Sequence, residues 1–81
     1  MGGRRLDLKA AAGIAKQHIN SAFAIGTPRD LRLEAFIYDD HLMVWSLTIG
    51  FAAASQGSET RISKIVRVSE ANQSVLSISD P

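Results

Sequence analysis

The chain has no cysteine among its 81 residues, which excludes disulfide bonds, thiolate metal sites and nucleophilic cysteine chemistry. It also has no apolar run approaching the roughly 18 residues that cross a bilayer. The basic start is followed by Asp7 and Lys9, which interrupt the apolar core that a signal peptide needs. By elimination we expect a cytoplasmic protein that does not associate with membranes.

Neither sign of charge is in large excess. The formal net charge is +1 and the pI is near 8.2, so nothing draws the chain strongly to nucleic acid or to an anionic surface. Hydrophobic residues make up 46% and charged residues 21%, as in an ordinary globular domain. A chain this short buries only a little over about 60% of its unfolded surface. With no disulfides available, we expect self-association to add the missing stability.

The first part of the chain predicts a flexible N-terminus over residues 1–6 and a helix over residues 7–26. Asp7 is placed to cap the first turn, with Leu6 and Ala11 as a hydrophobic staple. Gly26 can adopt the left-handed conformation that ends a helix, and Pro28 prevents its continuation. The apolar arc expected at roughly 100° per residue consists of Leu8, Ala11, Ala12, Ala15, Ile19, Ala22 and Phe23.

After residue 30 the hydrophobic period changes to two, which predicts an antiparallel sheet over residues 31–79. We expect strands at residues 31–38, 42–51, 60–68 and 74–78, with a mobile connection over residues 52–59. Asn72 is the expected left-handed residue of the last turn. Lys64 interrupts an apolar face, so either it extends its amine from an edge or a bulge shifts the register there.

The fold class is therefore α+β: one N-terminal helix packed on a four-stranded antiparallel β-meander in strand order 1-2-3-4, a single domain over residues 1–81. Trp45 is the side chain whose truncation we expect to destabilise the domain most. The predicted core consists of Leu8, Ala11, Ala15, Ile19, Ala22, Phe23, Leu33, Ala35, Ile37, Met43, Trp45, Leu47, Ile49, Phe51, Ile62, Val66, Val68, Leu76 and Ile78.

Strict alternation leaves the opposite sheet face with too many apolar side chains to be covered by water alone, which favours an interface with a second copy or a protein partner. Arginines mixed with aromatics on an open sheet also suggest a single-stranded RNA binder. The near-neutral charge, the presence of Glu34 and the lack of an RNP-like motif argue against RNA. The expected interaction surface consists of Phe36, Tyr38, Val44, Arg61, Ile65, Arg67 and Val75.

No pattern indicates catalysis. The serines lie outside any G-x-S-x-G motif, and no glycine-rich phosphate loop follows a strand. Asp39-Asp40-His41 is the one local group of metal-ligating residue types. Three consecutive side chains point in divergent directions and no second histidine or carboxylate is spaced to complete a site, so we expect a polar hairpin tip. His18 lies at the margin of the helical arc, where we expect a partly buried packing residue. We therefore predict no catalytic residue, no cofactor, no metal and no small-molecule substrate.

The order of a helix, a strand hairpin, a variable loop and the segment RISKIVRVSEANQSVLSI resembles small bacterial helix-plus-meander domains of the PepSY-like and cystatin-like kind. The resemblance covers residues 7–79, although the aromatic usual near Ile62 and the glycine usual at Gln73 are missing. It implies this fold and an accessory or inhibitory module without catalytic residues. The matching places are occupied by Lys64, Val66, Val68, Glu70, Asn72 and Val75-Leu76-Ser77-Ile78.

These observations together favour a non-enzymatic interaction module, a homodimer that works through the outer sheet face or an exposed strand edge. The alternative is a small inhibitor or immunity-type protein that inserts the Asp39-Asp40-His41 tip into a partner enzyme. A single-stranded nucleic-acid binder that uses Arg61, Arg67, Phe36 and Tyr38 ranks third.

Overall fold

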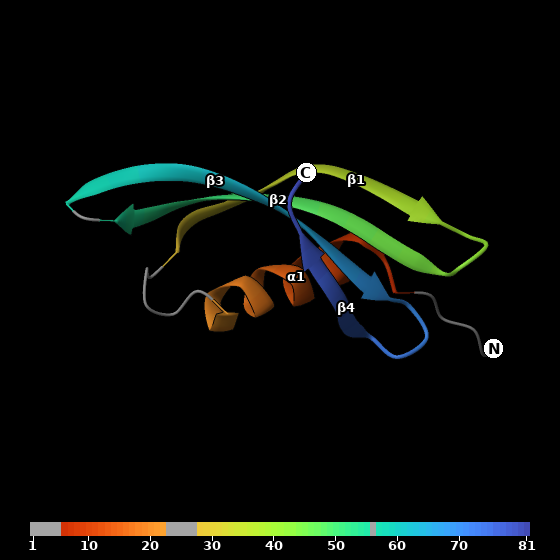
Figure 1. Ribbon diagram of the computed structural model, residues 1–81. Coiled ribbons are helices and arrows are strands. Elements are labelled where there is room, and N and C mark those ends of the chain that lie inside the picture. The colour runs from red at the N-terminus through yellow and green to blue at the C-terminus, as the bar shows by residue number, and fades with distance from the viewer. Residues whose placement is uncertain (1–5, 23–27, 56) are drawn as a thin grey trace.

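The computed structural model describes residues 6–22, 28–55 and 57–81. It contains α1 (Leu8–Ala22), β1 (Arg29–Asp39), β2 (Val44–Ser55), β3 (Ser58–Ser69) and β4 (Ser74–Ser79). The strands form one antiparallel sheet in the order β1-β2-β3-β4, with α1 along one side of it (Figure 1). The predicted α+β class and meander topology are confirmed.

Helix α1 begins where Asp7 caps it. The Asp7 carboxylate accepts a hydrogen bond from the Ala10 amide at 2.8 Å, and its carbonyl accepts one from Ala11 at 2.9 Å. Of the predicted arc, Ala11, Ala12, Ala15 and Ile19 are buried, as expected. Ala22 and His18 are exposed, so both burial predictions are wrong. The predicted positions Phe23 and Gly26 lie outside the described residues.

Strands β2 and β3 form the longest regular pairing in the sheet. Their register runs without a shift from Val44↔Ser69 to Ser55↔Ser58, so most of the predicted mobile connection over residues 52–59 is strand. Gly57, at φ 82°, adopts the left-handed backbone that this tight hairpin needs. The prediction of a loop failed because the small side chains of this segment resemble those of a connection although the backbone pairs.

Strand β1 carries a β-bulge at Glu34. Leu33 lies opposite Ile49 and Ala35 lies opposite Thr48, which leaves Glu34 as an extra residue. A second shift lies between Arg29 and Arg32, where Asp30 has a φ of 54°. Because side chains alternate along a strand, one extra residue moves every later side chain to the other face. The prediction that Ala35 and Ile37 face the helix is therefore wrong.

A bulge also reorients β4. Ser77 lies opposite Arg67 and Val75 lies opposite Val68, so Leu76 is the extra residue and is exposed. Val75 and Ile78 pack against the core, whereas the prediction placed Leu76 there and Val75 outside. In the preceding turn the left-handed residue is Gln73, at φ 52°, and not Asn72. Asn72 instead donates its amide to the Ser69 hydroxyl at 3.2 Å.

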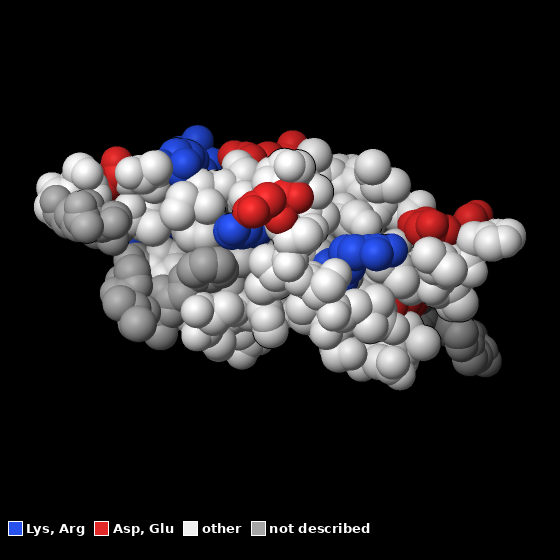
Figure 2. Space-filling view, in the orientation of Figure 1, with Lys and Arg blue, Asp and Glu red and all other residues white. Residues whose placement is uncertain are grey.

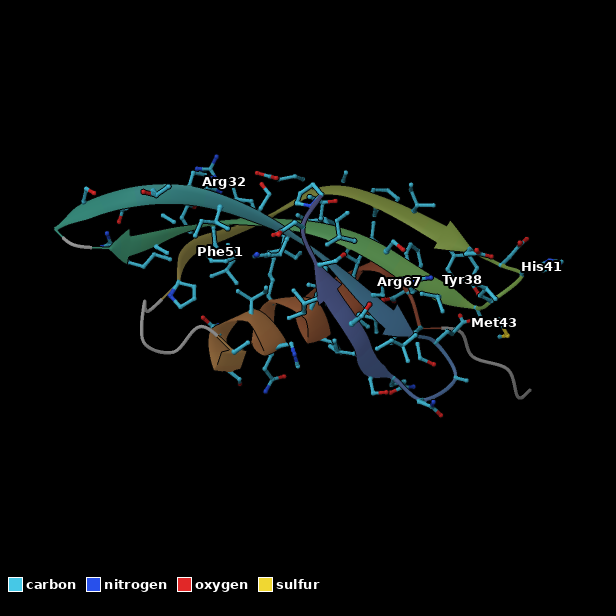
Figure 3. The ribbon with its side chains drawn as sticks, in the orientation of Figure 1. Arg32, Tyr38, His41, Met43, Phe51 and Arg67 are labelled. Atoms are coloured by element: carbon cyan, nitrogen blue, oxygen red, sulfur yellow. The ribbon has the colours of Figure 1, made fainter. Side chains whose placement is uncertain are left out.

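The core lies between α1 and strands β2, β3 and β4. Phe51, with no exposed surface, is the largest fully buried side chain, and Figure 3 shows it pointing toward the helix while Arg32 points away. Leu6 is buried, although the sequence placed it in a flexible N-terminus. Met43 is exposed in the β1–β2 turn, at φ 57°, so its core prediction is wrong. The central buried cluster consists of Leu6, Ala11, Ala15, Ile19, Leu47, Ile49, Phe51, Val66 and Val68.

Lys64 lies on the helix side of β3, opposite Ile49, in an unshifted ladder. Its side chain is mostly buried and its amine forms an ion pair with the exposed carboxylate of Asp80. Of the two alternatives for this position, the structure supports an amine that extends from an apolar face to the surface, not a bulge.

The molecule is elongated, with extents of 51 × 19 × 17 Å, because the two hairpins that flank β2 extend beyond the ends of α1 (Figure 1). The radius of gyration is 13.4 Å, above the about 11.7 Å expected for a compact domain of this length. Within the described ranges, no helix is long and apolar enough to cross a membrane.

Candidate interaction site

Four exposed large apolar side chains gather at one end of the sheet. Phe36 is 51% and Ile37 70% exposed on β1, and Leu42 and Met43 follow in the β1–β2 turn at 60% and 43%. Phe36 lies across from Leu47 on the helix side, whereas Ile37 lies across from Ser46 on the outer face, the face away from α1. Neighbouring residues of one edge strand thus expose apolar side chains on both faces.

Part of β1 is a regular edge strand. From Ala35 to Asp39 each residue pairs with β2 without a shift, between the bulge at Glu34 and the turn that starts at Asp40. We call these five residues the β1 edge segment. Its first four side chains are Ala, Phe, Ile and Tyr, with no charge and no proline. Sheet edges of this kind readily accept another strand, and proteins usually protect them with charges or bulges.

The remaining edges of the sheet carry such protection. The first part of β1 holds two register shifts and the charged residues Arg29, Asp30 and Arg32. Strand β4 is short and contains the Leu76 bulge. Because β4 pairs only with Ile65–Ser69, the earlier part of β3 also lies at an edge, and there the charged residues are Glu59, Arg61 and Lys64. Among the described strands, the β1 edge segment is the one regular edge that carries four consecutive uncharged side chains, from Ala35 to Tyr38.

Three aromatic rings support this segment on the helix side. Tyr38 lies directly across from Trp45, with ring centroids 4.8 Å apart, and Phe36 contacts the same indole at 6.2 Å, both in tilted arrangements. The Trp45 indole N–H donates to the Leu6 carbonyl at 2.9 Å, which ties the chain entering α1 to β2. Helix α1 packs on β2, β3 and β4, so the side of β1 that carries Phe36 lies beyond the helix.

The buried carboxylate of Glu70 binds the Tyr38 hydroxyl. The Tyr38 hydroxyl donates to Glu70 Oε1 at 2.6 Å, and the Glu70 amide donates to the Met43 carbonyl at 3.0 Å. Glu70 is buried, and its Oε2 has no hydrogen-bond partner in the part of the chain that the structure describes. These bonds connect the β3–β4 turn to the end of the β1–β2 hairpin, where Figure 3 shows Tyr38 and Met43 close to the tip.

The structure divides the predicted interaction surface between two faces. Val44, Arg61, Ile65 and Arg67 lie on the outer face, as predicted, with Val44 buried and Ile65 partly buried. Phe36, Tyr38 and Val75 lie on the helix side, so the prediction that they share the outer face is wrong. The bulges at Glu34 and Leu76 cause this error. The arginines and aromatics grouped for the nucleic-acid alternative therefore do not share one surface.

The centre of the outer face is rich in small hydroxyl side chains. Ile37 shares its row with Ser46, Arg67 and Ser77, and the next row contains Ala35, Thr48, Ile65 and Ser79. Arg67 forms no ion pair with any described residue. Apart from Ile37 the exposed apolar surface here is small, which moves the candidate site from the outer face to the β1 edge segment.

The Glu34 side chain lies across the next part of the outer face, over Gly50 and next to Ser63. Its carboxylate lies over Gly50 and accepts a hydrogen bond from the Ser63 hydroxyl at 2.8 Å. A Cβ atom at position 50 would overlap this carboxylate, so Gly50 is the residue that lets Glu34 reach across β2.

Replacing Gly50 with alanine is therefore expected to destabilise the domain by about 1 kcal/mol, because the carboxylate must move away and lose its bond to Ser63. In a Glu34→Ala background the same change should be neutral or stabilising by about 0.5 kcal/mol, because alanine loses less backbone entropy than glycine. Urea unfolding of the four variants gives both values. An equal cost in both backgrounds would contradict the role assigned to Glu34.

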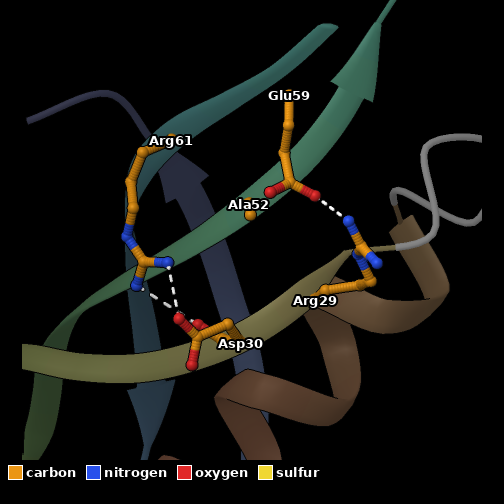
Figure 4. Close-up of a pocket in the computed structure, with 5 residues that line it drawn as sticks. All are labelled: Arg29, Asp30, Ala52, Glu59 and Arg61. Carbon is orange, nitrogen blue, oxygen red and sulfur yellow. Dashed lines mark hydrogen bonds and ion pairs between the residues drawn. The ribbon is translucent and has the colours of Figure 1, made fainter. Parts of the chain in front are cut away.

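Charged side chains of opposite sign meet at the far end of the outer face (Figure 4). Arg29 pairs with Glu59, and Asp30 pairs with Arg32 at 2.9 Å and Arg61 at 3.1 Å, around a hollow of about 490 Å³ floored by Ala52. The hydrogen bond from Arg32 and the nearby positive charges lower the pKa of Asp30. These pairs are exposed and screened by solvent, and blue and red atoms stand side by side along this rim in Figure 2.

The Asp39 carboxylate stabilises the β1–β2 turn. Asp39 Oδ1 accepts hydrogen bonds from the amides of His41 at 2.9 Å and Leu42 at 3.1 Å, which shapes the turn. In the described part of the chain, no three metal-ligating side chains come together. The exposed His41 at this tip and His18 on α1 lie on separate elements.

Comparison with known proteins adds no identification. No protein-family model, no curated protein sequence and no solved structure matches the chain. Function has to be inferred from the geometry of the surface itself.

Proposed function

We propose that the domain is a non-enzymatic protein-interaction module that binds an added β-strand along the β1 edge segment. The observation that carries the proposal is the exposure of Phe36 and Ile37 on opposite faces of the same edge strand. A partner resting on one face of the sheet would cover only one of them. A strand added in the plane of the sheet covers both, because its own side chains alternate between the faces.

The segment also defines the chemistry of its partner. Residues that lie across from Phe36 and Ile37 should be apolar or aromatic, since cross-strand pairs of this kind stabilise antiparallel sheets. The partner strand must lack proline, because each of its amides toward β1 has to donate. Side-chain charge is not required, which agrees with the uncharged run from Ala35 to Tyr38.

A displayed library of ten-residue peptides tests this function without a known partner. Selection on the wild-type domain should enrich peptides with alternating aromatic and β-branched residues. Their binding should weaken at least tenfold on Ile37→Lys, because a buried lysine at the new pairing site lacks a counter-charge. Leu76→Lys is the matched control, since Leu76 is a similarly exposed apolar residue on the opposite edge.

Two results would contradict the proposal. One is a selection that enriches no sequence above an unrelated domain. The other is a set of enriched peptides that bind Ile37→Lys as tightly as wild type, or that lose binding only to Leu76→Lys.

A further inference from the structure

We infer that the strand added to the β1 edge segment belongs to a second copy of this chain, paired antiparallel about a two-fold axis at Ile37. This inference rests on the proposed function and names its partner. The segment runs from Ala35 to Asp39, and Ile37 is its middle residue. A two-fold axis there is the one register in which both copies use the full regular segment, since an axis at Phe36 would bring the Glu34 bulge into the ladder.

This register brings complementary side chains together. An axis perpendicular to the sheet keeps each face on its own side, so Ile37 meets Ile37 of the second copy on the outer face. On the helix side, Phe36 of each copy lies across from Tyr38 of the other copy, so the axis creates two such pairs. Ala35 lies across from Asp39, so no like charges oppose each other within the segment.

The rest of the molecule leaves room for this arrangement. Helix α1 packs on β2, β3 and β4, and the joining strands would be the two copies of β1. The product is one continuous sheet of eight strands with both helices on the same side. Between the helices, the rings of Phe36, Tyr38 and Trp45 from both copies would form one apolar surface over the joint.

Surface area supports a partner of this size. The chain exposes 5364 Å², whereas monomeric proteins of 8.7 kDa expose about 4,700 Å². The excess of about 660 Å² approaches the about 800 Å² that each partner contributes to a standard interface.

Single cysteines test the axis directly, because the chain contains none of its own. Residues directly across an antiparallel pair have Cβ atoms about 4.5–5.5 Å apart, close to disulfide distance. Under a glutathione redox buffer, Ile37→Cys should form a covalent dimer much faster than Phe36→Cys or Leu76→Cys. In sedimentation equilibrium the wild type should be dimeric at high micromolar concentration, and Ile37→Lys should raise the dissociation constant at least tenfold.

Three outcomes would overturn the inference. Faster cross-linking of Phe36→Cys than of Ile37→Cys refutes this axis, and faster cross-linking of Leu76→Cys refutes this edge. A wild type that stays monomeric up to roughly 1 mM, the weak end of specific affinity, refutes the second copy. If Ile37-dependent peptides are nevertheless selected, the strand-binding function stands and only the identity of the partner is wrong.

Discussion

Replacing Phe51 with alanine is expected to lower the free energy of unfolding by about 3–5 kcal/mol, through lost apolar contacts and the cavity left behind. Phe51 has no exposed surface and lies on β2 in the buried cluster, across from Ile62. An 81-residue domain has a total stability of about 4–12 kcal/mol. The variant should therefore be largely destabilised, and partly unfolded at room temperature if the wild type is near the lower value.

Phe36→Ala is the matched control, since it removes the same side chain from a position that is half exposed. Its expected cost in the monomer is about 1 kcal/mol, because roughly half of the side chain's burial energy is available to lose. Urea unfolding followed by circular dichroism, in an Ile37→Lys background that suppresses association, gives both values. A larger loss for Phe36→Ala than for Phe51→Ala would contradict the position assigned to the core.

Removing the Tyr38 hydroxyl is a second change that we expect to lower stability substantially. In Tyr38→Phe the Glu70 carboxylate loses the donor at 2.6 Å while its other oxygen already lacks a partner among the described residues. Hydrogen bonds to charged groups contribute about 1.5–3 kcal/mol, so we expect a loss of that size. The ring itself should keep its contact with Trp45, because phenylalanine has the same shape there.

A double-mutant cycle assigns this effect to Glu70. Glu70→Leu removes the buried carboxylate, and in that background Tyr38→Phe should cost less than about 0.5 kcal/mol. Glu70→Leu alone should be close to neutral, since replacing a buried polar group by an apolar one of similar size removes its desolvation penalty. If Tyr38→Phe were equally costly with and without Glu70, the hydroxyl would be stabilising the fold through another contact.

The helix and the strand pairing could be predicted because each depends on local residue patterns. Asp7 at the helix start, the alanines at Ala11 and Ala15, and the alternation from Trp45 to Phe51 all match the structure. The extent of the β2–β3 hairpin could not be predicted, because alanine and serine carry little strand preference of their own. Pairing between the two strands determines that segment instead.

The exposure of Phe36 was predicted, but the face of the sheet on which it lies was predicted wrongly. Apolar residues of β1 were expected at an interface, and Phe36 is indeed exposed. Its face was wrong because alternation was counted through Glu34, which gives no sign in the sequence of being an extra residue. The faces predicted for Leu76 and Val75 were also wrong, because Leu76 is the extra residue of a bulge. Glu70 was taken for a turn residue, and its burial against Tyr38 depends on two turns that lie far apart in the sequence.

The absence of cysteine by itself excluded thiol chemistry, and the change of hydrophobic period near residue 30 by itself indicated an α+β domain. Those properties depend on composition and on neighbours along the chain. The tertiary structure alone decided which face each side chain of β1 and β4 occupies, and which edge of the sheet pairs regularly behind a run of uncharged side chains. A bulge is set by how two strands fit across the sheet, so its effect on every later residue appears only once the strands are paired.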